Sequence, residues 1–223
     1  MTVGLRVHTG FPRVTTAVIG MAASLPVSVV GDASNRLQCL PAGFRHYGAR
    51  RKFAGPALTV RVRAGDNLLL HKALDLAQPG DVVVCDAGDE MRSAIMGALM
   101  ARYATSRRIS AVVISGAIRD VDELKELNIA VVARGSTPNG PFKSGPGEVG
   151  FPIACAGVIV SPGDLVIGDG DGVLVLPREG AAEIVGRAAE IAKLETQWAS
   201  QIDDGTWPRE WVNESLARMG LSA

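Results

Sequence analysis

The sequence predicts an α/β fold with a mixed sheet, on three observations. Between residues 57 and 135, runs rich in Val, Ile and Ala alternate with amphipathic segments, which is the pattern of an α/β protein. Between residues 157 and 177, three apolar runs follow one another with only turns between them, so we expect antiparallel strands there. The 26 Gly and 12 Pro residues mark no linker, so we expect one domain over residues 1–223.

The spacing of apolar residues places the individual elements. Apolar runs bounded by turns predict strands at 57–64, 81–87, 111–116, 129–135, 157–163, 164–170 and 172–177. Helical spacing predicts helices at 67–77, 121–128 and 179 to about 201. The segment 89–105 leaves two interpretations open, namely one continuous amphipathic helix or a helix that begins only at Gly97.

Two Gly-rich segments and the N-terminal apolar stretch need separate treatment. Residues 78–89 (QPGDVVVCDAGD) resemble residues 161–172 (SPGDLVIGDGDG), either because one Pro-Gly turn is used twice or because a half-barrel is duplicated. The sequence GDGDG at 168–172 lacks the spaced ligands of a calcium loop and predicts a tight hairpin. Thr, Ser, Gly and Pro26 interrupt the stretch 14–31, which favours a core helix followed by a strand or loop over a signal peptide or membrane span.

Composition excludes several classes of function. Lys plus Arg equals Asp plus Glu at 23 each, and aromatic residues make up 4% of the chain, so we expect no nucleic-acid partner. The three cysteines show no C-x-x-C spacing and no nearby His, which argues against a zinc site. An odd, scattered set of cysteines is typical of reduced thiols, so we expect a cytoplasmic protein without a membrane partner.

The C-terminal region carries an apolar helical stripe followed by Trp207 and Trp211. A terminal helix with aromatic residues either docks onto a neighbouring subunit or covers the core of its own chain. We expect the helices of residues 179–220 to lie at a subunit interface.

The strongest local signal for chemistry is SGAIRDVDELKEL, residues 115–127, where Arg119 and Asp120 follow a predicted strand. Arg suits bidentate contact with a carboxylate, and one Asp with waters and a chelating substrate is a common way to hold Mg²⁺ or Mn²⁺. A surface ion pair or a helix cap is the alternative interpretation. If a helix begins at Gly97, the backbone N–H groups of Gly97, Ala98, Leu99 and Met100 also favour an anion.

Segments in this order and spacing resemble the RraA-like family: VVGDA, FAGPALTV, PGDVVVCDAGD, VVISGAIRDVDEL and PIACAGVIVSPGDLVIGDGDGVLVLP, within residues 28–200. That family includes 4-hydroxy-4-methyl-2-oxoglutarate and 4-carboxy-4-hydroxy-2-oxoadipate aldolases, oxaloacetate decarboxylases and RraA regulators of ribonuclease E. The resemblance implies a swivelling β/β/α sandwich, assembled as a homotrimer or homohexamer with sites between subunits.

The resemblance also implies roles for individual residues. The amides of Gly97, Ala98, Leu99 and Met100 and the guanidinium of Arg119 would bind a pyruvate unit, and Asp120 would hold Mg²⁺ or Mn²⁺. The metal and Arg119 would stabilise the enolate that forms when a C–C bond breaks. Glu195 corresponds loosely to an acid/base that the family draws from a neighbour's C-terminal helix.

The chain departs from the family at Ala98, because the aldolases carry an acidic residue 21 positions before the Arg. Asp89 and Glu90 are candidates to replace it. The regulators, by contrast, lack the metal-binding Asp, which this chain keeps. We therefore expect a metal-dependent lyase for a 2-oxo acid, by retro-aldol cleavage or oxaloacetate decarboxylation, with a non-catalytic RraA-type regulator as the alternative. A basic loop either reads a second substrate carboxylate or is simply solvated, and its residues are Arg45, His46, Arg50 and Arg51.

Overall fold

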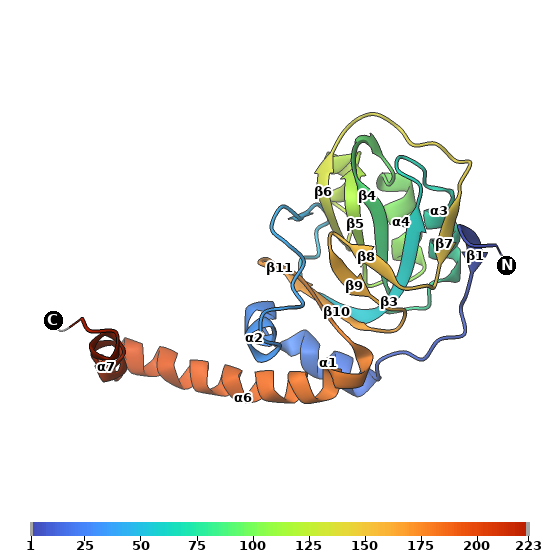
Figure 1. The fold of residues 1–223 in the computed structure, drawn as a ribbon. Helices are drawn as coiled ribbons and strands as arrows, with labels where there is room; N and C mark the ends of the chain where they lie inside the picture. The colour runs from blue at the N-terminus through green and yellow to red at the C-terminus, as the bar shows by residue number, and fades with distance from the viewer. Residues whose placement is uncertain (1, 222–223) are drawn as a thin grey trace.

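The computed structural model describes residues 2–221 and shows a mixed α/β fold (Figure 1). Four strands form the parallel centre of the main sheet: β3 (Phe53–Val62), β4 (Val82–Ala94), β5 (Ala111–Ile118) and β6 (Ala130–Ser136). Beside them lie β7 (Gly147–Val149), antiparallel to β3, then β1 (Leu5–Val7), and at the other edge β2 (Arg45–His46), antiparallel to β6. The predicted mixed sheet is confirmed.

Side-chain alternation along the central strands divides the core into layers. On β4, Val83 and Cys85 face the layer of α3 (Leu68–Leu76) and α4 (Ala98–Ser106), whereas Val82 and Val84 face the opposite side. That side is covered by β8 (Ile153–Cys155), β9 (Val158–Val160), β10 (Leu165–Asp169) and β11 (Gly172–Leu176). Helices thus cover one face of the parallel strands and a second β layer covers the other, as buried parallel strands require. This is the β/β/α sandwich that the resemblance implies.

A further helical layer covers the outer face of the β10–β11 hairpin. It consists of α1 (Thr16–Ser24), α2 (Val27–Ala33) and the first half of α6 (Arg178–Asp203), packed on Leu165, Ile167, Leu174 and Leu176. Strand β3 joins the two β layers, because its first residues pair with β10 and its later residues with β4.

The structure corrects the prediction of a continuous helix over 89–105. Residues up to Ala94 continue β4, and α4 begins at Ala98 with Gly97 as its N-terminal cap. Gly88 and Asp89 have φ angles of 64° and 53°, which a helix does not accommodate, and pairing with β5 resumes beyond them. The later start at Gly97, the second interpretation, is the one observed.

The similarity between 78–89 and 161–172 is a repeated turn. In both, the Asp after Pro-Gly accepts a hydrogen bond from a backbone N–H three residues earlier, Gln78 to Asp81 (2.9 Å) and Ser161 to Asp164 (2.8 Å). The following strands differ in context, since β4 is parallel to its neighbours and β10 is antiparallel. Residues Asp169–Gly172 form the tight hairpin turn that GDGDG predicts.

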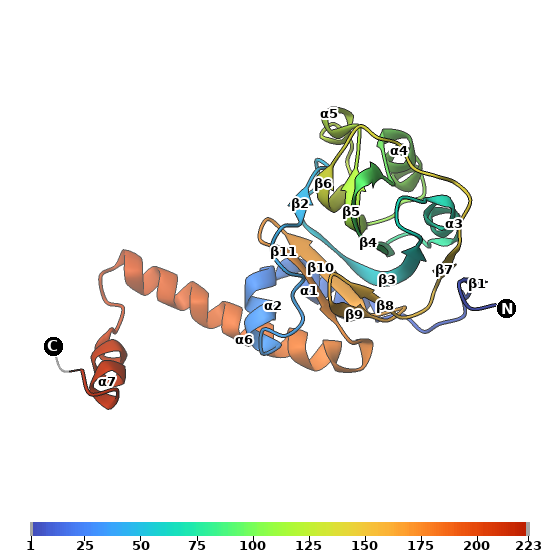
Figure 2. The same cartoon turned by 45° about the horizontal axis from the view of Figure 1, so that its top comes forward.

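The C-terminal region projects from the body as an arm, defined here as residues 189–218 (Figures 1 and 2). It comprises the outer half of α6 and all of α7 (Glu210–Arg218). Its side chains include an apolar set that is at least 40% exposed: Leu194, Trp198, Ile202 and Trp211. Among residues 2–221 no single helix is long and apolar enough to span a membrane, and only α1 and α2 together, bent by 113°, reach that length and composition.

Candidate functional site

Arg119 and Asp120 lie where β5 ends, as the sequence predicts. The Arg119 N–H donates to the Met96 carbonyl oxygen (2.9 Å), which ties the strand end to the segment before α4. Asp120 has a φ angle of 60°, and its carbonyl oxygen accepts from Leu124 in the short helix α5 (Val121–Leu124). This sharp turn directs both side chains to the edge of the sheet where the parallel strands end, a usual position for ligand sites in α/β folds.

The Asp120 carboxylate sits on the first turn of α4. Its Oδ2 accepts a hydrogen bond from the Ala98 N–H (3.0 Å), and the Arg119 Nε lies 3.7 Å from the same oxygen. A Cβ on Gly97 would lie 2.2 Å from that oxygen, so only glycine permits this approach. The helix start and Arg119 together compensate the charge of Asp120.

Further unpaired donors surround this carboxylate. The N–H groups of Gly97, Leu99 and Met100 have no hydrogen-bond partner within residues 2–221, because they precede the first full turn of α4. Three of the four predicted amides are therefore free to bind an anion, and the fourth, that of Ala98, donates to Asp120.

These groups line a cleft of about 310 Å³ between α3, α4 and the loop before β7. A second hollow of about 310 Å³ lies on the other side of Arg119 and Asp120, against Ser136, Thr137 and Pro138. Three segments line the first cleft besides Arg119 and Asp120. They are the start of α3 (Asn67 and His71), the segment leading into α4 (Ala94, Ile95, Met96, Gly97, Leu99 and Met100) and the loop before β7 (Gly140, Pro141 and Lys143). The buried methyl group of Ala98 is not among them.

Three polar residues of the cleft were missed from the sequence, namely Asn67, His71 and Lys143. Asn67 and His71 are four residues apart, and that spacing puts two side chains on one face of a helix. This spacing is the available signal, but on its own it predicts only an amphipathic helix. Lys143 gave no signal, because it lies in a loop with no periodicity.

Asn67 is 3% exposed, and its amide is held in one orientation. Its Nδ2 donates to the Ile95 carbonyl oxygen (3.0 Å) and approaches the Met100 sulfur (3.4 Å). Its Oδ1 has no hydrogen-bond partner within residues 2–221. A buried acceptor without a donor is costly, so it marks a place where a ligand group fits.

The wall of the cleft is fixed by Asp66. Its carboxylate accepts from the backbone N–H groups of Leu68 (2.9 Å), Ser144 (2.7 Å) and Gly145 (2.9 Å). Burial alone would raise the pKa of Asp66, but these three donors and nearby Arg63 bring it below its ordinary value. The ionised carboxylate thus fastens the loop that carries Lys143 to the start of α3.

The surroundings of His71 favour the neutral form of its imidazole. Partial burial lowers its pKa, the charge of Lys143 lowers it further, and Asp75 opposes them. A neutral imidazole accepts a proton, and His is the side chain that most often does so at physiological pH.

The possible metal ligands in the cleft suit a hard divalent cation whose remaining ligands come from the substrate. Within residues 2–221 no three His, Cys, Asp or Glu side chains lie close enough together to hold a metal ion by themselves. Asp120 supplies one carboxylate at the edge of the cleft. Mg²⁺ commonly binds one or two carboxylates and takes its other ligands from water and substrate, so the residues fit such an ion.

Other predicted site residues lie away from the cleft. Glu195 is exposed on α6 and does not line the cleft of its own chain. Asp89 lies 3.8 Å from Arg134, and Glu90 pairs with Arg92 (3.1 Å), so neither replaces the missing acid at Ala98.

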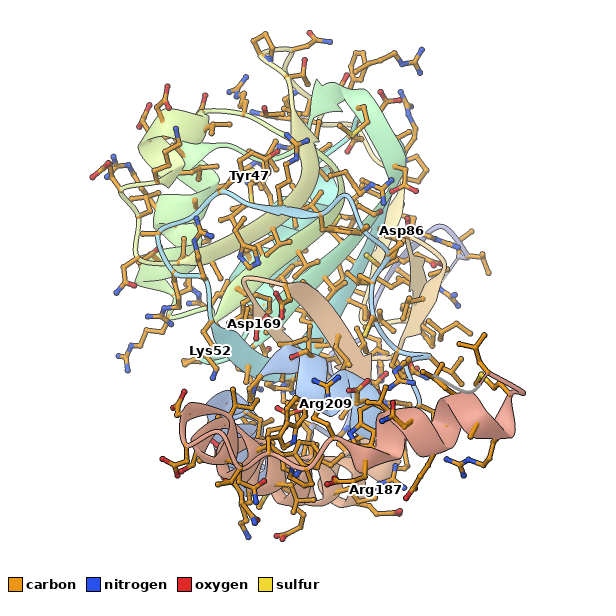
Figure 3. The ribbon with its side chains drawn as sticks, turned by 90° about the vertical axis from the view of Figure 1, so that its left-hand side faces the viewer. Tyr47, Lys52, Asp86, Asp169, Arg187 and Arg209 are labelled. Atoms are coloured by element: carbon orange, nitrogen blue, oxygen red, sulfur yellow. The ribbon has the colours of Figure 1, made fainter. Side chains whose placement is uncertain are left out.

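The basic loop also lies elsewhere, on the edge of the sheet beyond β6. Arg45 and His46 pair with β6, and none of Arg45, His46, Arg50 and Arg51 lines the cleft. Figure 3 shows this side of the molecule, with Lys52 at the end of the loop near Asp169 of the β10–β11 hairpin. Within one chain, this loop therefore does not reach a substrate carboxylate bound in the cleft.

Sequence comparisons connect the chain to aldolases. Residues 27–175 match the family described as RraA-like: Aldolase/RraA. A 4-hydroxy-4-methyl-2-oxoglutarate aldolase from Thermus thermophilus is 40% identical over 140 residues, which cover 63% of this chain and 85% of that protein. A putative aldolase of the same name from Halalkalibacterium halodurans is 39% identical over 155 residues, covering 70% of this chain and 74% of that protein.

Structural comparisons connect it equally to RraA proteins. The RNA-processing inhibitor RraA from a Thermus species is 37% identical with a TM-score of 0.64, covering 68% of this chain and 92% of that one. An unusual member of the RNase ES inhibitor RraA protein family from Streptomyces coelicolor is 26% identical with a TM-score of 0.76, covering 85% of this chain and all of that one.

Proposed function

Because the chain belongs to the RraA-like family, we propose that it is an aldolase-type lyase that needs a divalent metal and acts on a 2-oxo acid through a pyruvate enolate. The observation that carries the proposal is the meeting of Arg119, Asp120 and the unpaired amides of α4 in one cleft. A guanidinium, a carboxylate and a helix start are the groups needed to bind a carboxylate and a metal side by side.

Each group has a defined task in this proposal. The amides of Gly97, Leu99 and Met100 and the guanidinium of Arg119 orient the substrate carboxylate, so that the C–C bond to be broken points into the cleft. Asp120, together with the carboxylate and keto oxygens of the substrate, would hold Mg²⁺ or Mn²⁺, which supplies Lewis acidity to the keto group. Arg119 then stabilises the enolate charge as it develops.

The same arrangement serves two substrates. Retro-aldol cleavage of 4-hydroxy-4-methyl-2-oxoglutarate, the substrate in the names of the aldolase relatives, leaves a pyruvate enolate. Decarboxylation of oxaloacetate leaves the same enolate, so one carboxylate site and one metal ligand suffice for both.

We also propose that the active form is a homo-oligomer, a trimer or hexamer, in which the arm of one copy reaches the cleft of another. The arm exposes Leu194 and Trp198 beside Glu195, and no side chain of α7 within the described residues is buried. Exposed apolar stripes of this kind favour subunit contacts. Glu195 would then act in the neighbour's cleft, as the family resemblance implies.

Pyruvate release tests the proposal. We expect release from oxaloacetate or 4-hydroxy-4-methyl-2-oxoglutarate with Mg²⁺ or Mn²⁺ and none with EDTA. Asp120→Ala should lower kcat/KM by at least about 10²-fold, the scale for losing a charge-stabilising group. Asp122→Ala is the matched control, because Asp122 lies two residues away, is exposed and pairs only with Lys125. Equal activity of the two variants would contradict the role of Asp120.

Two observations favour the regulator alternative: the likeness to solved RraA inhibitors, and the methyl group of Ala98 where the aldolases carry an acid. If the folded wild-type protein releases pyruvate from neither substrate, this alternative gains support. Inhibition of a ribonuclease E by the purified chain would then be the measurement to make.

A further inference from the structure

The proposed function leaves one chemical task without a residue. In retro-aldol cleavage, the hydroxyl group on the carbon that becomes a carbonyl must lose its proton as the C–C bond breaks. Ala98 has no acceptor, and Asp89 and Glu90 are engaged with Arg134 and Arg92 away from the cleft. Any proton acceptor must therefore come from another wall of the cleft or from outside the chain.

The wall formed by α3 carries two suited groups. The Asn67 Oδ1 is a buried acceptor without a donor, fixed because its Nδ2 is held by the Ile95 carbonyl oxygen. His71 follows four residues later and lines the same cleft. One turn of helix separates the two side chains, so a single hydroxyl group can be reached by both.

We propose that this face of α3 handles the proton in retro-aldol cleavage. Asn67 accepts the hydrogen bond of the substrate hydroxyl and fixes its position, and His71 takes the proton. The O–H bond breaks and its electron pair forms the new C=O bond. The C–C bond breaks in turn, and its electron pair passes into the pyruvate enolate, which is later protonated. This inference rests on the proposed function and assigns it a base.

The charges around His71 agree with this role. Lys143, from the loop before β7, and Arg119 are the cations that line the cleft. The charge of Lys143 disfavours a charged imidazole before substrate binds. Asp120 is the carboxylate of the cleft, and it is engaged by the Ala98 N–H and lies near Arg119. Asp75 lies on α3 itself, and its Oδ1 accepts from the Tyr103 hydroxyl (2.9 Å).

Oxaloacetate distinguishes the role of α3 from the rest of the site, because its decarboxylation involves no hydroxyl proton. We expect His71→Gln to lower kcat/KM for 4-hydroxy-4-methyl-2-oxoglutarate about 10²-fold, while oxaloacetate turnover stays within about threefold of wild type. Asn67→Ala should raise KM for the hydroxylated substrate about tenfold, the scale of one hydrogen bond. Lys72→Gln is the control, since Lys72 neighbours His71 but does not line the cleft.

The pH profile gives a second readout that a structural role would not move. Wild-type kcat/KM for the hydroxylated substrate should fall on the acid side as His71 becomes protonated, at a pH below its ordinary pKa, and His71→Gln should lose that limb. The His71 side chain is not part of the hydrophobic core around α3, so this variant should fold even if Asn67→Ala does not.

Four results would overturn the proposal. A parallel loss on both substrates in His71→Gln would make His71 a general binding residue, and an unchanged hydroxylated-substrate rate would remove it from the mechanism. If wild type cleaves neither substrate, the proposed function fails and this inference fails with it. If wild type decarboxylates oxaloacetate only, the enolate chemistry stands and the role of α3 is rejected.

Discussion

The two halves of α6 have the same secondary structure and opposite surroundings. In the inner half, Ala181, Val185 and Ala188 are buried against α1, α2 and the β10–β11 hairpin. In the outer half, Leu194 and Ile202 are 47% and 52% exposed, and no side chain between residues 189 and 221 is fully buried. The body therefore contacts the helix only as far as Ala192, the last residue of α6 that packs against the core.

The difference shows which apolar residues the fold itself requires. The inner stripe completes a core layer, so its removal should unfold the chain more easily. The outer stripe, with the apolar hollow of about 330 Å³ between Trp198, Trp207, Pro208 and Trp211, contributes little to the body. Exposed apolar surface of this extent favours a partner, and a second copy of the chain is the partner we propose.

The largest effect is expected in the layer beneath the inner half of α6. Leu174 on β11 is fully buried there. Leu174→Ala should lower the free energy of unfolding by about 3 kcal/mol, because a cavity remains where the side chain packed. Urea denaturation measures this, and a loss below about 1 kcal/mol would mean that the helical layer adapts to the cavity.

The next largest effect on the free energy of unfolding is expected when Asp66, in the wall of the cleft, is replaced. Asp66→Asn should lower the free energy of unfolding by about 2 kcal/mol, because an uncharged amide cannot accept from all three backbone N–H groups. Denaturation should show this loss at neutral pH, and an unchanged stability would contradict it.

The pH dependence of this effect has a definite sign. The pKa of Asp66 is lower in the folded chain, so its stabilisation is present above the unfolded-state value of about 3.9. It should be lost as the pH falls through the folded-state pKa. The wild-type and Asp66→Asn proteins should therefore become more similar in stability under acidic conditions.

Much of the body could be predicted from sequence because its signals are local. The apolar runs at 111–116 and 129–135 match β5 and β6, and Gly97 marked the start of α4 as one of two interpretations. The extension of β4 to Ala94 could not be predicted, because Met91 and Ile95 also fit a helical period and only pairing with β5 decides between them.

The part of the site that a local motif encodes could be predicted from the sequence. The part that only tertiary contacts bring together could not. Arg119 and Asp120 stand together in the sequence, and the structure brings them to the amides of α4. Asn67 and Lys143 are 76 residues apart, and they share a cleft because Asp66 and the backbone pairing of Phe142 fasten the loop of Lys143 to the start of α3. No local pattern encodes such a contact.

A matched pair within α6 tests the comparison directly. Val185→Ala should lower the free energy of unfolding by about 1.5 kcal/mol, because it removes buried methyl groups. Ile202→Ala in the outer half should change the free energy of unfolding of the chain itself by less than about 0.5 kcal/mol. Both should be measured at a concentration where the protein is monomeric, and equal losses would show that the arm packs on its own body.

The smallest effect on the chain itself is expected at Leu194, where the effect on association should be large instead. Leu194→Gln keeps a good helix former, so the free energy of unfolding should change by less than about 0.5 kcal/mol. If the outer stripe binds a second copy, this variant should have a smaller mass by light scattering at concentrations where wild type is oligomeric. Lys193→Gln is the control, because Lys193 is exposed and contacts only Glu190 through an ion pair. An unchanged mass for Leu194→Gln would place the subunit contact elsewhere, and Glu195 would then lose its route to a neighbour's cleft.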